Sequence, residues 1–153
     1  MKYPPQPPQR VLYVAEPPAT YLIYPPLVVD CSMIATLLFQ EDLRDDAERR
    51  LADRRLHAPE LLDYEFANVA MNKIRRKQAN LVPLVSLALA LYDEYPIDLH
   101  PINVAATVNL AQRYNLSAYD AAYLWLAAEL KAPLATFDAK LGEAAMVHLS
   151  TLT

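Results

Sequence analysis

Four acidic residues in this chain have settings that are typical of a metal-dependent site. Asp30 lies in LVVDCS, Glu65 in LLDYEFANV, Asp120 in NLSAYDAAYLWLA and Asp138 in APLATFDAKL. Four carboxylates brought close together cannot all stay ionised without a cation, because like charges raise one another's pKa. Hard divalent ions prefer such oxygen ligands. If folding gathers these acids, they predict a divalent metal site suited to phosphoryl-transfer chemistry.

Asp30 and Glu65 each have a structural alternative. Asp30 follows a short apolar strand, and ligands gather beyond the carboxyl ends of parallel strands. It could equally be a turn or N-cap acid before a helix that Ser32 opens. Glu65 shares a helical face with Leu61 and Val69. A glutamate that faces inward needs a partner or a metal, whereas one at a boundary reaches water.

Asp120 and Asp138 have stronger structural alternatives. Asp120 stands three residues after Ser117, the spacing of a capping box in which the acid reaches back to the cap backbone. Asp138 could be the N-cap of the last helix. The hydroxyls of Ser32 and Thr136 could orient a water or a phosphate, or could simply bond the backbone.

The first 26 residues hold most of the thirteen prolines and predict an extended arm, partly in the polyproline II conformation. Within it, segments 11–14 and 21–24 resemble strands. They could lie along a sheet edge, in a groove or on a second subunit, or belong to a loosely tethered tail. Residues 1–26 are therefore interpreted as a proline-rich arm and residues 27–153 as one globular domain.

Strands and helices alternate from residue 27 onward. Strands are predicted at 27–29, 56–58, 97–99, 134–136 and 147–149. Helices are predicted at 32–39, 42–55, 59–78, 81–95, 103–114, 117–131 and 138–142. This alternation predicts an α/β sandwich with a mostly parallel central sheet. Gly142 is the only glycine, which excludes phosphate-binding loops that need several glycines.

Composition limits the function classes. With 153 residues and 54% hydrophobic residues, one compact domain is expected. The net charge of −4 argues against nucleic-acid binding through bulk positive charge. A single cysteine, Cys31, allows no intrachain disulfide, so a reduced, cytoplasmic location is expected. No ordinary signal peptide and no membrane-spanning stretch are recognised, and no membrane association is expected.

Basic residues form two groups, and each has two interpretations. They are Arg44, Arg49, Arg50, Arg54 and Arg55, followed by Lys73, Arg75, Arg76 and Lys77. Either group could contact the phosphates of a nucleic acid. The first could instead belong to an ordinary solvated helix, and the second to a helix end where cations suit the dipole.

The histidines do not predict a zinc site, and the aromatic residues are interpreted as packing residues. The three histidines, His57, His100 and His148, are scattered in the sequence without zinc-ligand spacing. The aromatic residues Tyr119, Tyr123 and Trp125 are expected to pack in a core or a subunit interface.

The ordered series VVDCS, ELLDYEFANV, LSAYDAAYLWLA and APLATFDAKL resembles the PIN-domain family, in particular the VapC-type toxins of toxin–antitoxin pairs. The resemblance covers about residues 27–150. Matched position by position, it makes Asp30, Glu65, Asp120 and Asp138 the acidic quartet. It implies a parallel sheet flanked by helices, Mg²⁺ or Mn²⁺ dependence and endoribonuclease activity. It also implies a homodimer and an antitoxin that inserts a segment near the active site. The proline-rich arm departs from the family pattern.

The hypothesis from the sequence is metal-assisted hydrolysis of RNA. Asp30 and Asp120 are the first-choice direct ligands, while Glu65 and Asp138 bind directly, bind through water or position the attacking water. One alternative keeps the fold as a catalytically inactive protein-binding module. Another is a metal-dependent DNA nuclease. A phosphoacceptor receiver domain fits less well, because no acidic residue is adjacent to Asp30.

Overall fold

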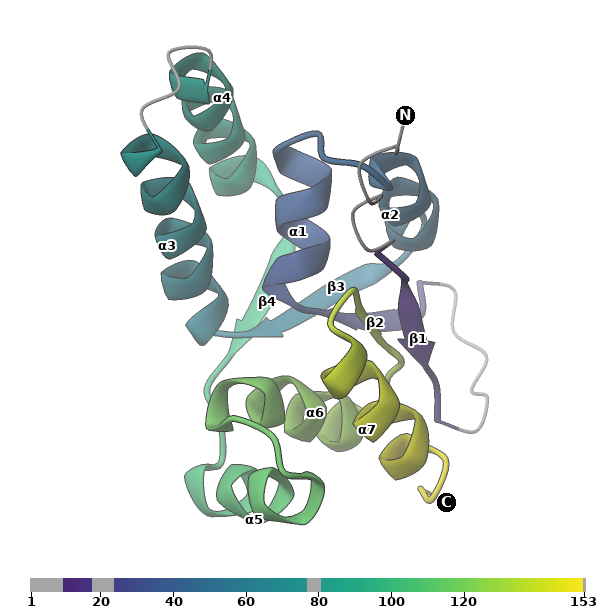
Figure 1. Ribbon diagram of the computed structural model, residues 1–153. Helices are drawn as coiled ribbons and strands as arrows, with labels where there is room; N and C mark the ends of the chain where they lie inside the picture. Colours follow the sequence, from purple (N-terminus) through teal and green to yellow (C-terminus); the bar gives the residue numbers. More distant parts are fainter. Residues whose placement is uncertain (1–9, 18–23, 77–80, 153) are drawn as a thin grey trace, which may run out of the picture.

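The computed structural model describes residues 10–17, 24–76 and 81–152. A five-stranded sheet with the order β1-β5-β2-β3-β4 forms its centre (Figure 1). The strands are β1 (Tyr13–Ala15), β2 (Pro26–Val29), β3 (Arg55–Pro59), β4 (Ile97–His100) and β5 (Leu134–Thr136). β2 to β5 are parallel to their neighbours, and β1 alone pairs in the antiparallel direction, with β5. The expected mostly parallel sheet is confirmed.

Helices cover both faces of the sheet. They are α1 (Cys31–Leu38), α2 (Arg44–Leu51), α3 (Leu61–Arg75), α4 (Leu81–Glu94), α5 (Val104–Tyr114), α6 (Ala118–Leu130) and α7 (Ala139–Leu149). Figure 1 shows α1 to α4 on one face and α5 to α7 on the other. α3 and α4 form a hairpin that projects away from the sheet, and α5 packs on α6. The α/β sandwich is therefore confirmed.

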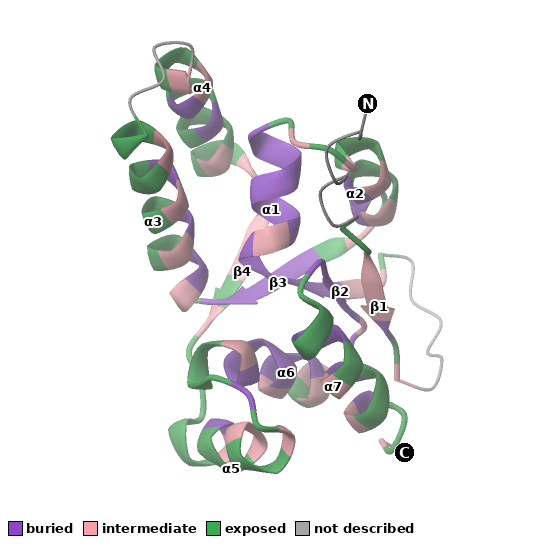
Figure 2. Ribbon diagram, in the orientation of Figure 1, coloured by how far each residue is buried: buried purple, intermediate pink, exposed green. Residues whose placement is uncertain are grey.

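The central strands, α1 and α6 together hold more than half of the buried apolar residues (Figure 2). Leu27, Val28 and Val29 are fully buried, and so are Leu134 and Ala135. Strands covered on both faces read as continuous apolar runs, which is why these short segments were recognisable from sequence. None of the helices in the described ranges is long and apolar enough to cross a membrane.

Three predicted helix starts are wrong. α1 begins at Cys31 with Asp30 as its N-cap, so Ser32 lies inside the helix. α2 spans only Arg44–Leu51, and Arg55 opens β3 instead of ending that helix. Pro59 is the last residue of β3, where it pairs in register with His100, and α3 starts two residues later. The predicted end of α3 at residue 78 lies outside the described residues.

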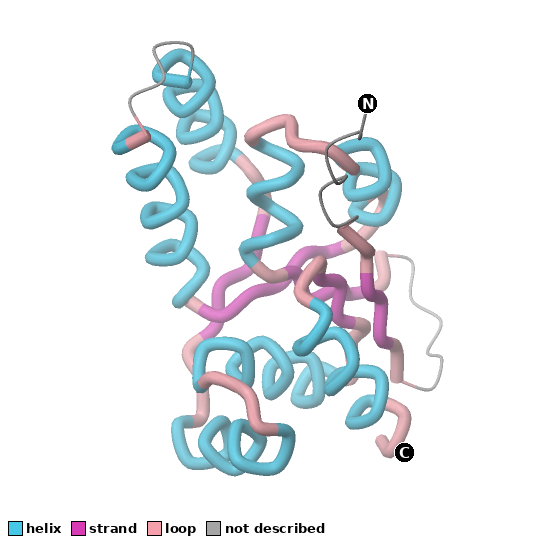
Figure 3. Tube along the Cα trace, viewed as in Figure 1, coloured by secondary structure: helices cyan, strands magenta, loops and turns pink. Residues whose placement is uncertain are grey.

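The C-terminal prediction is also wrong, because α7 continues through Gly142 to Leu149 (Figure 3). No strand forms at 147–149. Leu141, Ala145 and Leu149 are each fully buried, at a spacing of four residues that matches one helical face. Gly142 does not end the helix. It makes room for the arm, since a Cβ atom there would lie 2.4 Å from Cβ and Cγ of Tyr13.

The described part of the N-terminal arm lies along a sheet edge. Tyr13 pairs with Thr136, and Ala15 pairs with Leu134 and is 2% exposed. The strand-like segment predicted at 21–24 lies almost wholly outside the described residues. The division into an arm of residues 1–26 and a domain of residues 27–153 stays a prediction.

Candidate active site

The four acids lie around the carboxyl ends of the central parallel strands. Asp30 directly follows β2, and Asp138 follows β5 by two residues. Val29 pairs with Ala135, so the next residues along, Asp30 and Thr136, meet at the same edge of the sheet. This edge is the usual ligand site in open parallel sheets.

Asp30 is held in a dense set of hydrogen bonds. Its side chain is buried, and Oδ1 accepts from the Ser32 hydroxyl at 2.6 Å and from the Met33 N–H at 3.2 Å. The Thr136 hydroxyl donates to Oδ2. Asp30 is thus an N-cap and also an oriented carboxylate at the sheet edge. The two interpretations from sequence do not exclude one another.

The same hydroxyls connect Asp30 to the segment after β5. Ser32 Oγ accepts from the Phe137 N–H at 2.9 Å, and Thr136 Oγ1 accepts from the Asp138 N–H at 2.9 Å. Each hydroxyl therefore bonds both the backbone and Asp30. As a result, the position of Asp30 depends on the backbone of residues 136–138.

Glu65 comes from the second turn of α3 and is half-buried. Its Oε1 accepts a hydrogen bond of 2.7 Å from the hydroxyl of Tyr123 on α6. Tyr123 is 1% exposed, as expected for a core residue, but its contact with Glu65 was missed. The available signal was its spacing of three residues from Asp120, which places both on one side of a helix.

Asp120 and Asp138 both stand at helix starts. Asp120 lies in the first turn of α6, where its N–H donates to the Ser117 hydroxyl at 3.0 Å. Asp138 is the exposed N-cap of α7 and accepts from the Leu141 N–H at 2.8 Å. Ser117 therefore caps α6 through the Asp120 N–H, and Asp138 caps α7 with its own carboxylate. The Asp120 carboxylate takes no part in the first contact, and the second uses one of the about four acceptor sites of a carboxylate.

The negative charge of one acid raises the pKa of the next, from Asp138 through Asp120 and Glu65 to Asp30. Burial raises the pKa of Asp30 to about 6, against the lowering effect of its hydrogen bonds, and the charge of Glu65 raises it further. Burial and then the charge of Asp120 raise the pKa of Glu65, while the Tyr123 hydrogen bond lowers it. Burial and then the charge of Asp138 raise the pKa of Asp120. The structure thus brings all four predicted acids within electrostatic reach of a neighbour.

The donor set fits a hard divalent cation. It consists of carboxylate oxygens whose negative charges destabilise one another, which a cation would relieve. In the conformation described, no three acidic, histidine or cysteine side chains among residues 10–17, 24–76 and 81–152 are close enough to enclose an ion. Direct coordination by three or more of them would need side-chain rotation, or water between ligand and ion.

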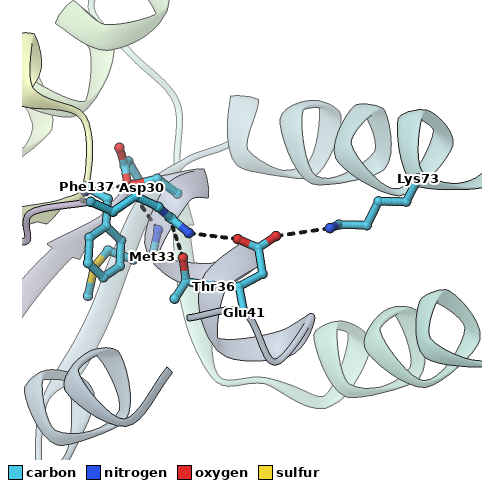
Figure 4. A network of polar contacts seen from close by, with 8 residues as sticks. Asp30, Met33, Thr36, Glu41, Lys73 and Phe137 are labelled. Atoms are coloured by element: carbon cyan, nitrogen blue, oxygen red, sulfur yellow. Dashed lines mark hydrogen bonds and ion pairs between the residues drawn. The ribbon is translucent and has the colours of Figure 1, made fainter. Parts of the chain in front are cut away.

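Of the eight residues in the two basic groups that the structure describes, four form ion pairs. Arg49 pairs with Asp46, Arg50 with Glu16 and Arg55 with Asp98. Lys73 binds Glu41 at 3.0 Å (Figure 4). Lys77 lies outside the described residues. Arg49 fits the interpretation as a cation on a solvated helix, whereas Arg55 lies on β3. Lys73 lies in the last turn of α3, as the helix-end interpretation expects, and its side chain is only 17% exposed.

The positions of two histidines and one tyrosine differ from what the sequence suggested. His57 and His100 are not scattered in space, because adjacent strands place His57 Nδ1 2.9 Å from His100 Nε2. Tyr119 does not pack in the core, since 68% of it is exposed.

Burial raises the pKa of the Cys31 thiol to about 12, which keeps the thiol protonated beside the acids.

A family model described as PIN domain matches residues 27–146. The chain belongs to the PIN-domain family. The crystal structure of PAE2754 from Pyrobaculum aerophilum has a TM-score of 0.61 and 19% identity, and the match covers 82% of this chain and 89% of that one. At this identity, the likeness concerns the fold alone.

Two curated relatives carry the VapC name. Ribonuclease VapC3 from Pyrobaculum aerophilum is 29% identical over 121 residues, which cover 76% of this chain and 92% of that protein. Ribonuclease VapC9 from Mycobacterium tuberculosis is 30% identical over 117 residues, which cover 76% and 89%. The resemblance to VapC-type PIN proteins is therefore confirmed, and the match of the family model begins at residue 27, after the proline-rich arm.

Proposed function

We propose that this protein is a divalent-metal-dependent endoribonuclease, the toxin component of a VapBC-type toxin–antitoxin pair. The supporting observation is the chain of four mutually repelling carboxylates at the carboxyl edge of a PIN-type sheet. Relatives named as ribonucleases, similar over most of both chains, favour RNA as the substrate.

Each side chain has a role in this proposal. Asp30 and Asp120 are the first-choice ligands of Mg²⁺ or Mn²⁺, which when bound would stabilise phosphate charge and lower the pKa of a water molecule. Ser32 and Thr136 fix the direction of the Asp30 carboxylate. Glu65 and Asp138 complete the acidic set, directly or through water.

Glu65 is also suited to orient an attacking water or to accept its proton. Burial raises its pKa toward the range useful for proton transfer near neutral pH. The Tyr123 hydroxyl keeps the carboxylate in place. Burial and the charge of Glu65 raise the pKa of Tyr123, so this hydroxyl remains a hydrogen-bond donor.

Protein partners are part of the proposal. The α3–α4 hairpin exposes apolar side chains that would favour contact with another protein, either an antitoxin or a second copy of this chain. They are Met71, Ile74, Val82, Leu87, Leu89 and Leu91, each at least 38% exposed.

The activity is tested with purified protein and matched single-stranded RNA and DNA of one sequence. Each is incubated with MgCl₂, with MnCl₂ or with EDTA, and the products are resolved by length. We expect internal cleavage of RNA that requires the metal. Cleavage of DNA alone would instead make the protein a DNA nuclease. If neither RNA nor DNA is cleaved in any of these buffers, the result would favour the catalytically inactive binding module.

Tyr123→Phe is expected to move the acidic limb of the pH profile of RNA cleavage to higher pH. The Tyr123 hydrogen bond lowers the pKa of Glu65, so its removal lets that pKa rise further. The loss of one hydrogen bond should cost about 1 kcal/mol of stability and leave the fold intact. The profile is measured as initial cleavage rate between pH 5 and 9. Tyr119→Phe, which changes an exposed hydroxyl on the same helix, is the control and should leave the profile unchanged.

A further inference from the structure

The N-terminal arm pairs with the strand that contains Thr136 and contacts the loop that leads to Asp138. Along β1, the three residues Tyr13 to Ala15 pair in register with Thr136 to Leu134. The Tyr13 side chain also packs over Gly142 of α7, where its Cβ and Cγ occupy the space that a side chain would need. β5 is therefore held between β2 on one side and the arm on the other.

The guanidinium of Arg10 lies over the ring of Phe137, the residue that follows β5. The guanidinium carbon lies 4.8 Å from the centre of the Phe137 ring. Nη2 donates to the buried Thr36 hydroxyl at 2.7 Å, and Nη1 donates to Glu41 at 2.9 Å. A planar guanidinium can lie over a ring while its N–H groups donate within the plane of the guanidinium itself. Phe137 is thus covered by a cation that α1 and the following turn fix in place.

Glu41 connects the guanidinium of Arg10 to Lys73, because it accepts a hydrogen bond from each. Figure 4 shows Glu41 between Lys73 and the guanidinium that also reaches Thr36. Lys73 comes from α3, the helix of Glu65, and lies 4.7 Å from the centre of the Phe39 ring. Both terminal nitrogens of Arg10 donate in these contacts, which use two of the five N–H groups of the guanidinium. The geometry therefore favours a fixed side chain that acts on its neighbours over one free to meet a substrate.

Phe137 connects the arm to the acids. Its N–H donates to Ser32 Oγ, and Ser32 donates to Asp30 at 2.6 Å. The residues on either side of Phe137 supply the Thr136 hydroxyl, which donates to Asp30, and the Asp138 N–H, which donates to Thr136. A shift of Phe137 would disturb every one of these bonds.

We propose that residues 10–15 form a clamp on residues 134–138 and that Arg10 is a positioning residue for Asp30 and Asp138. The clamp is an addition to the family region, which begins at residue 27. Its effect on metal binding and catalysis rests on the proposed function. Its effect on the backbone of residues 136–138 does not.

The test compares Arg10→Ala, Arg10→Lys and the wild-type full-length protein. Amide hydrogen exchange of Phe137 and Asp138 is followed by NMR without metal. We expect exchange about tenfold faster in Arg10→Ala, from the loss of the cation–π contact with Phe137 and of the two guanidinium hydrogen bonds, to Thr36 and to Glu41. Arg10→Lys keeps a cation but not the planar fork, so it should restore part of the protection. Arg113→Ala removes a comparable contact with the Tyr114 ring, at 5.6 Å on α5, and should change nothing at these two amides.

Metal affinity and kinetics provide two further readouts. Calorimetric titration with MnCl₂ should show affinity about three- to tenfold weaker in Arg10→Ala, as for other residues that orient metal ligands. On RNA, kcat should fall while KM changes little. Gly142→Ala, which displaces Tyr13 without touching Arg10, should accelerate the same two amides.

The possible contradictions are distinct. Unchanged exchange at Phe137 and Asp138 in Arg10→Ala would overturn the clamp. A rise in KM alone, with a weaker salt dependence of RNA binding, would show that Arg10 contacts phosphate and would overturn the positioning role. If the wild-type protein cleaves no RNA, the proposed function fails, whereas the exchange measurements at Phe137 and Asp138 still decide whether the clamp exists.

Discussion

Asp30→Asn is expected to reduce metal-dependent RNA cleavage by at least about a hundredfold while leaving the fold intact. Asparagine has nearly the same shape, and its oxygen can still accept from Ser32 and Met33. It lacks the negative charge that a cation requires. The measurement is the initial rate of cleavage in MgCl₂, with circular dichroism to confirm folding.

The control for this substitution is Asp53→Asn. Asp53 is exposed and has a left-handed backbone with φ of 58°, which asparagine tolerates well. The same chemical change there should leave cleavage unaltered. Induced expression should correspondingly arrest growth with the wild-type and Asp53→Asn genes, but not with Asp30→Asn. Cleavage by Asp30→Asn at the wild-type rate would refute the assignment of Asp30.

Without metal, Asp30 should make the folded protein less stable as pH rises from about 4 to 6. Burial raises its pKa from 3.8 to about 6, so the folded state binds the proton more tightly than the unfolded chain does. The stability from this protonation is fully present below pH 3.8 and is lost as pH rises through 6. The full loss is at most about 3 kcal/mol at neutral pH.

Asp30→Asn isolates this effect from other titrating groups. His57 and His148 act in the opposite direction, since burial lowers the pKa of each and their contribution is lost as pH falls. Urea unfolding in EDTA should therefore find Asp30→Asn more stable than wild type at pH 7 and equal to it near pH 4. Added MgCl₂ should stabilise wild type more at pH 7 than at pH 5, because ligands must lose their protons to bind metal. An equal difference between the two proteins at both pH values would contradict the buried charge.

Elements with a local signal were recognisable from sequence alone. The strand at 27–29 and the strand at 134–136 are continuous apolar runs because both faces of the sheet are covered. Asn103 and Ser117 cap their helices as their residue types predict. The four acids could also be named, since each follows a strand or lies on a helix next to apolar residues.

Other features depended on contacts that are distant in sequence. Gly142 predicts a helix end, yet α7 continues because Leu141, Ala145 and Leu149 bury one face and Tyr13 fills the space above the glycine. Pro59 suits a first helical turn, yet it ends β3 because its strand neighbour β4 pairs with it there. Tertiary packing outweighed local propensity at both positions.

The sequence by itself determined which residues could hold a cation, because acid type and flanking apolar runs are local properties. Only the tertiary structure decided how Asp30 is held, since Ser32, Thr136 and Phe137 reach it through hydrogen bonds across two strands. It also decided that part of the arm belongs to the sheet, because strand pairing between residues 13–15 and 134–136 is a long-range contact that no local pattern encodes.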